Sequence, residues 1–88
     1  MTHTYKTNGT CSRTITFDLE DGIVRGVRFE GGCHGNLQGI GKLVEGRPAA
    51  EVAETLAGIR CGFKPTSCPD QLAKALTEAL AQEQEAAQ

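Results

Sequence analysis

Two stretches of alternating polar and apolar residues, separated by a turn signal, constrain the fold of this 88-residue chain more than any other feature. The first stretch covers 14–20, the second covers 23–30, and Asp21-Gly22 lies between them. Alternation is typical of a half-buried strand, and Asp-Gly is a hairpin turn signal. The chain is therefore predicted to contain an antiparallel β-hairpin with one apolar face.

The length of the loop decides the register of this hairpin, because a shift by one residue turns every side chain to the other face. A three-residue loop, 20–22, pairs Leu19 with Ile23 and gathers the large apolar side chains except Val24 on one face. We therefore expect the three-residue loop. The same register turns Arg25 toward the core, which is its weakest point.

Three amphipathic segments after the hairpin are predicted to be helices. The first covers 37–45 with Asn36 as its N-cap, the second opens at Pro48, and the third opens at Pro69. The predicted fold is therefore α+β. It consists of an N-terminal antiparallel β-hairpin or small sheet packed against about three C-terminal helices.

The chain is short enough for one domain, 1–88, with an ordered core over about 4–81. The tail, 82–88, has no large apolar residue and is predicted to fray. Hydrophobic residues make up 39% of the chain, but many of them are Ala, so the core is thin. Small domains of this kind often need a metal ion, disulfides or a partner chain. Gly39 and Gly41, inside a predicted helix, are expected to permit close packing.

Charge and hydropathy exclude several classes of protein. The formal net charge is −2 and no basic block exists, so we expect no dedicated nucleic-acid partner. No apolar run is long enough to cross a membrane, and the polar start lacks the core of a signal peptide. The expected location is therefore the cytoplasm. In that reducing compartment, cysteines serve as metal ligands or reactive thiols more often than as disulfides.

Four cysteines, Cys11, Cys33, Cys61 and Cys68, are the main candidates for chemistry. The predicted register places Cys11 and Cys33 together at the open end of the hairpin. Cys68 is predicted as the N-cap of the third helix, whose N-terminus favours a thiolate. Four converging thiolates would form a closed zinc site, which is structural rather than catalytic. The alternatives are cysteines packed as small hydrophobic residues, or a redox pair in which Cys61 resolves a nucleophilic Cys68.

Two turns that precede predicted helices are candidate anion sites, because a helix N-terminus presents backbone N–H groups to a phosphate. Their residues are Gly32, His34, Gly35 and Asn36 in the first turn, and Lys64, Thr66 and Ser67 in the second. A nucleotide or flavin would rest its phosphate on one of them. The first turn matches neither G-x-G-x-x-G nor the Walker pattern, so a tight turn is its simpler interpretation. The simpler interpretation of the second turn is a helix cap. No catalytic triad or carboxylate pair can be assembled.

The segment Thr66-Ser67-Cys68-Pro69-Asp70, with the four cysteines and their glycine neighbours, resembles the small stand-alone TSCPD-domain proteins of bacteria. The resemblance covers about 4–80 and maps the four family cysteines onto Cys11, Cys33, Cys61 and Cys68. It implies a metal site on these thiols, since the family is suspected of binding metal through them. A related domain lies at the C-terminus of some adenosylcobalamin-dependent ribonucleotide reductases, which implies a link to nucleotide reduction.

The expected function is a metal-stapled accessory or regulatory binding domain, with zinc as the ion and a nucleotide or a reductase-like protein as further partner. We expect no enzyme activity of the chain on its own, because it lacks the large barrel that such reductases need. The alternatives are a small nucleotide- or flavin-binding protein and a thiol-redox protein. A homo-oligomer is compatible with each of them.

Overall fold

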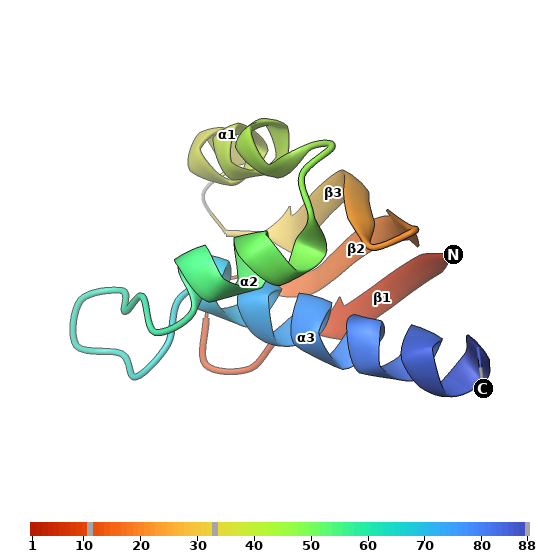
Figure 1. Ribbon diagram of the computed structural model, residues 1–88. Helices are drawn as coiled ribbons and strands as arrows, with labels where there is room; N and C mark the ends of the chain where they lie inside the picture. The colour runs from red at the N-terminus through yellow and green to blue at the C-terminus, as the bar shows by residue number, and fades with distance from the viewer. Residues whose placement is uncertain (11, 33, 88) are drawn as a thin grey trace.

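The computed structural model describes residues 1–10, 12–32 and 34–87. A three-stranded antiparallel sheet in the order β1-β2-β3 comes first, and three helices follow (Figure 1). The strands are β1 (Thr2–Lys6), β2 (Ser12–Glu20) and β3 (Ile23–Gly31). The helices are α1 (His34–Val44), α2 (Ala49–Leu56) and α3 (Cys68–Ala87). The predicted α+β fold, a small sheet followed by three helices, is confirmed.

One face of the sheet carries the core. Ile15, Phe17 and Leu19 of β2 are at most 1% exposed, and Leu72 and Leu76 of α3 are fully buried in the same cluster. Helix α3 packs on β2, α2 packs on α3, and α1 packs beside β3. Alternate residues of β1 are exposed, so the opposite face of the sheet is polar at that strand. In the part of the chain that the structure describes, every helix is too short or too polar to cross a lipid bilayer.

Strand β1 was not expected as a separate element, because its alternation relies on the weakly apolar side chains His3 and Tyr5. Both are half-buried, and the strand pairs antiparallel with β2. The His3 ring stacks on Phe17 with the ring centroids 5.6 Å apart. Its Nε2 atom lies 2.7 Å from Oε2 of Glu83. This contact fastens β1 to the last turns of α3. The helix continues to Ala87, so it includes most of the segment 82–88 for which fraying is predicted.

The predicted hairpin register is wrong. The loop contains two residues, Asp21 and Gly22, and Leu19 pairs with Val24. Asp21 has a φ of 51° and Gly22 a φ of 78°. Positive φ at both positions gives the two-residue turn whose twist matches that of the flanking strands. The positive φ angles of Asp21 and Gly22 therefore set how the residues next to the loop pair.

A β-bulge reconciles this turn with a single apolar face. The pairing shifts between Thr16 and Asp18, and Gly26 on the opposite strand has a φ of 63°. One extra residue in β3 exchanges the two faces. As a result Val24 is fully buried before the bulge, while Val27 and Phe29 pack against the same core after it. Arg25, which the predicted register turned inward, is exposed.

Helix α1 begins at His34, earlier than predicted. Asn36 is therefore a residue of the first turn rather than the N-cap. Pro48 precedes α2 as its N-cap, so the second helix starts where it was expected.

Gly39 and Gly41 of α1 have different surroundings, which gives a matched test. A Cβ on Gly41 would lie 3.0 Å from the carbonyl oxygen of Val27, whereas no described heavy atom lies within 4 Å of one on Gly39. Alanine is favoured over glycine in a helix by about 1 kcal/mol. We expect Gly39→Ala to raise the free energy of unfolding by up to about 1 kcal/mol. Gly41→Ala should lower it by about 1–3 kcal/mol through overpacking. Urea unfolding of both variants checks this, and an equal gain in stability would contradict the close approach of α1 to β3.

Candidate functional site

The N-terminal turn of α3 gathers segments that are far apart in the sequence. The loop before β2 and the loop between α2 and α3 both lie at this end of the molecule, while the N-terminus and the end of α3 lie at the other (Figure 1). Every residue of 66–68 is buried here. We call this region the thiol end, because it holds Cys68.

Ser67, rather than Cys68, is the N-cap of α3. Its Oγ accepts the backbone N–H of Asp70 at 3.1 Å, and its hydroxyl donates to the carbonyl of Ile59 at 2.6 Å. A serine oxygen at this position satisfies one of the N–H groups that a helix start leaves without a partner. The expected cap at Cys68 is wrong because the helix already begins at Cys68. Ser67 also fastens the preceding loop to the helix.

Asp70 is a buried carboxylate that joins the helix to two other positions. It accepts the hydroxyl of Thr66 and, at 2.7 Å, the backbone N–H of Gly58. Lys74 lies one turn further along, with Nζ 3.5 Å from Oδ2. The pKa of Asp70 is lowered, first by the hydrogen bond from Thr66 and then by that from Gly58, which together outweigh the opposing effect of burial.

Gln71 extends this network to the loop before β2. Its Nε2 donates to Oγ1 of Thr66 at 3.0 Å, and its Oε1 accepts the backbone N–H of Asn8 at 3.1 Å. Gly9, with a φ of 78°, lies so close that a Cβ there would meet Cγ2 of Thr66 at 3.2 Å. The hydroxyls of Thr66 and Ser67 thus serve internal hydrogen bonds. Lys64, the third residue proposed for an anion there, is exposed.

Cys68 contacts the first residue of β2. Its Sγ lies 3.1 Å from Oγ of Ser12, and both residues are buried. Ser12 occupies the core face because the register of β2 shifts between Ser12 and Thr14. The expectation that Cys11 shares the face of the core rested on unbroken alternation, which this bulge interrupts. Cys11 itself lies outside the described residues.

Cys61 belongs to the loop between α2 and α3 and is exposed. Its N–H donates to the carbonyl of Thr66 at 3.2 Å, and its carbonyl accepts the N–H of Lys64 at 3.0 Å. Cys33, like Cys11, lies outside the described residues, so the expected set of four thiols is only half described. Within residues 1–10, 12–32 and 34–87, no three His, Cys, Asp or Glu side chains are grouped as metal ligands.

The first predicted anion turn leads into α1. Gly32 is exposed with a φ of 78°, His34 is the first residue of the helix, and Gly35 and Asn36 are exposed in its first turn. The turn is therefore a helix start with an open surface.

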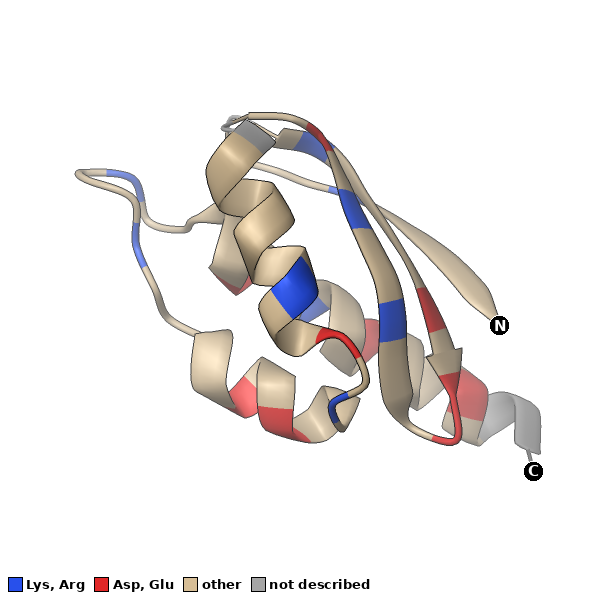
Figure 2. Ribbon diagram, turned by 90° about the horizontal axis from the view of Figure 1, so that it is seen from above, with Lys and Arg blue, Asp and Glu red and all other residues tan. Residues whose placement is uncertain are grey.

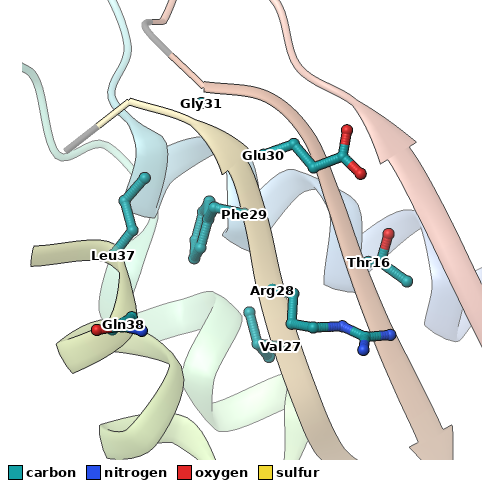
Figure 3. A pocket seen from close by; sticks show the side chains of 8 residues that line it. All are labelled: Thr16, Val27, Arg28, Phe29, Glu30, Gly31, Leu37 and Gln38. Atoms are coloured by element: carbon teal, nitrogen blue, oxygen red, sulfur yellow. The ribbon is translucent and has the colours of Figure 1, made fainter. Parts of the chain in front are cut away.

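A cleft of about 470 Å³ lies between β3 and α1, and sequence reasoning did not predict it. Figure 3 shows Phe29 and Val27 on the side of α1, with Arg28 and Glu30 on the other side of the strand. The residues that line this cleft are Thr16, Val27, Arg28, Phe29, Glu30, Gly31, Leu37 and Gln38. The cleft depends on how closely α1 approaches the edge of the sheet, so no local motif could have revealed it.

The lowered pKa of Asp70 predicts how stability depends on pH. A carboxyl group whose pKa is lower in the folded than in the unfolded protein adds stability above its ordinary value of 3.8. That stability is lost as the pH falls through the lower, folded pKa. We expect Asp70→Asn to cost about 1–3 kcal/mol at pH 7, because charge-assisted hydrogen bonds are weakened. Its penalty should shrink below pH 4, in urea unfolding curves recorded from pH 7 to pH 2. Glu20→Gln, an exposed carboxylate at the end of β2, is the control, and an equal pH profile for both variants would contradict the prediction.

Comparison with known protein families matches the TSCPD domain to residues 2–80. Comparisons with curated proteins and with solved structures gave no match. The matched region contains the whole sheet, α1, α2 and most of α3, so it extends far beyond the short motif at 66–70. The chain therefore belongs to the TSCPD domain family.

Proposed function

We propose that this protein is a small accessory binding domain whose fold is closed by a zinc ion on Cys11, Cys33, Cys61 and Cys68. Four thiolates complete a tetrahedral shell and leave no open position for a substrate or water, so the site is structural. The domain then acts by presenting its surface to a partner. The related domain of some ribonucleotide reductases supports a reductase-like protein as that partner.

The contact between Cys68 and Ser12 is the observation that carries this proposal. It brings the buried thiol at the start of α3 within 3.1 Å of the residue that directly follows Cys11 in the chain. Ser12 pairs with Gly31, which lies two residues before Cys33. Residues close in sequence to Cys11 and to Cys33 thus pair on adjacent strands, and Cys68 lies next to that pair.

The chemistry of the donors also fits zinc. Thiolates are soft ligands that favour zinc over calcium or magnesium, and the thiol of Cys68 is buried at the start of α3. Cys61 is bound through its backbone to Thr66, two residues before Cys68. Its side chain is exposed in the described conformation, and the proposal requires it to reach the same ion.

Metal analysis of the purified protein in reducing buffer tests the proposal. We expect about one zinc per chain, as for a closed four-thiolate site. Thiol titration of the native protein should detect no rapidly reacting cysteine until a chelator is added. Four reactive thiols and no metal would reject the site. Formation of a Cys61–Cys68 disulfide under mild oxidation would instead favour the thiol-redox function.

A nucleotide- or flavin-binding function is a second candidate, and the cleft between β3 and α1 favours it. Its volume, about 470 Å³, is typical of small-ligand pockets, and the Phe29 ring and Leu37 give it an apolar wall. The chain has no Trp and one Tyr, so a bound nucleotide or flavin would dominate the absorbance spectrum. This function would be excluded if the spectrum of the purified protein shows no nucleotide or flavin band, and if the protein binds neither a nucleotide nor a flavin added to it.

A further inference from the structure

The loop between α2 and α3, residues 57–67, presents an exposed aromatic side chain between two cations. Phe63 is fully exposed, at 109%, and Ile59 is 42% exposed. Arg60 and Lys64 flank them, and 57–67 contains no acidic residue. Figures 1 and 2 show this segment, which we call the basic loop, projecting away from the rest of the fold.

Hydrogen bonds hold the basic loop in this projecting position. The Gly58 N–H donates to Asp70, and the Ser67 hydroxyl donates to the carbonyl of Ile59, so both ends are fixed to the start of α3. At the tip, the bond from Lys64 N–H to the Cys61 carbonyl closes a four-residue turn. Gly62 has a φ of 59° in this turn. Phe63 is therefore presented in advance of binding, which reduces the entropic cost of using it as an anchor.

A complementary surface lies on the outer side of the two neighbouring helices. Two shallow clefts, of about 380 and 460 Å³, share Ala57, Thr77 and Ala81 and together form what we call the α2–α3 groove. Alanine is the commonest residue of the lining, so the groove leaves room for a larger side chain. Its charged lining residues are Glu54, Glu78 and the ion pair of Asp70 with Lys74. Neither Glu54 nor Glu78 forms an ion pair with any residue that the structure describes.

We propose that a second copy of this chain covers the α2–α3 groove, placing its Phe63 between the helices and its Arg60 and Lys64 against Glu54 and Glu78. The loop begins at Ala57, which itself lines the groove. A two-fold axis near this position therefore lets each chain give its loop to the other, in a closed symmetric dimer. A chain cannot use its own loop in this way, because both ends of the loop are held to α3.

Charge distinguishes this occupant from the other candidates. An anionic membrane or a nucleic acid would attract the basic loop but would leave Glu54 and Glu78 of the groove without a cationic partner. A second copy satisfies the aromatic anchor, the cations and the carboxylates at once. None of these contacts uses a thiol, so variants of Phe63, Glu54 and Glu78 test the dimer separately from the zinc ligands.

Sedimentation equilibrium at several protein concentrations tests the dimer. We expect Phe63→Ala to weaken dimerisation at least about tenfold, as for a buried aromatic anchor. Leu43→Ala is the matched control, because Leu43 is a 70%-exposed apolar side chain on α1, away from both surfaces, and it should leave the dimer unchanged. Circular dichroism confirms that each variant is folded. Monomeric wild-type protein up to millimolar concentration, or equal dimerisation of wild type and Phe63→Ala, would overturn the proposal.

Charge reversal tests the pairing itself. One variant carries Arg60→Glu with Lys64→Glu, and the other carries Glu54→Lys with Glu78→Lys. Each should be monomeric alone, because like charges face one another, and an equimolar mixture should form a heterodimer in which both contacts are restored. A mixture that stays monomeric while wild type dimerises would reject the assigned contacts.

A fluorescent variant reports the position of the ring. Because the chain has no Trp, Phe63→Trp supplies a single indole, whose emission can be excited apart from that of the one Tyr. Its emission should shift to shorter wavelength as the protein concentration rises. If the shift occurs only with vesicles of phosphatidylserine, and the protein alone stays monomeric, a membrane rather than a second copy is the partner.

Discussion

Removing the proposed zinc ion with a chelator in reducing buffer is expected to unfold the protein cooperatively, and restoring zinc is expected to refold it. A structural zinc ion contributes about 10–16 kcal/mol of apparent free energy to small domains. The net stability of a folded domain is only about 5–15 kcal/mol. In a chain of 88 residues whose core depends heavily on alanine, the loss of such an ion exceeds what packing can replace. Far-ultraviolet circular dichroism and metal content, recorded along one chelator titration, should change together.

Variants at the thiol end separate ligands from neighbours. Cys68→Ser and Cys61→Ser should each lose the ion and most of the folded population at 25 °C. Ser12→Ala, which removes a hydroxyl 3.1 Å from the sulfur of Cys68 but no ligand, should keep the ion and lose about 1 kcal/mol. A metal-free protein that unfolds as cooperatively, and at the same urea concentration, as the metal-loaded form would refute the structural role of zinc.

Leu76→Ala has the second-largest expected effect. Leu76 is fully buried where α3 packs on the sheet, and removing its side chain should cost about 2–5 kcal/mol, from lost burial and from the cavity left behind. Leu43→Ala is again a matched control, since it makes the same change in a helix at a 70%-exposed position and should alter stability by less than about 0.5 kcal/mol. Urea unfolding of both variants gives the two values. Equal costs would mean that α3 does not bury the face that the structure assigns to it.

Sequence periodicity was enough to predict the hairpin, three helices and their order, because each element carries a pattern of its own length. The register could not be predicted in the same way. Two bulges, near Gly26 and between Ser12 and Thr14, each exchange the faces of a strand, and strict alternation assumes that neither exists. Gly26 was visible as a glycine inside a strand, which is a known sign of a bulge, but its positive φ depends on the pairing.

At the thiol end too, features set by neighbouring residues could be predicted, whereas contacts between distant segments could not. The residues of the family motif were enough to predict a helix start, but the N-cap was predicted at Cys68 and lies at Ser67. The bonds from Gly58 to Asp70 and from Asn8 to Gln71 join segments that only the folded chain brings together. No spacing rule in the sequence encodes those contacts, so the motif could be recognised while its role as a tie between loops could not.

The contact between His3 and Glu83 has a consequence for how this domain can be built into larger proteins. It holds β1 and the last turns of α3 together, at the end of the molecule opposite the thiol end (Figure 1). A polypeptide joined to either terminus would leave on that same side and would obstruct neither the thiol end nor Phe63. A host protein could thus carry this fold at either end, or as an insertion, with the thiol end left accessible.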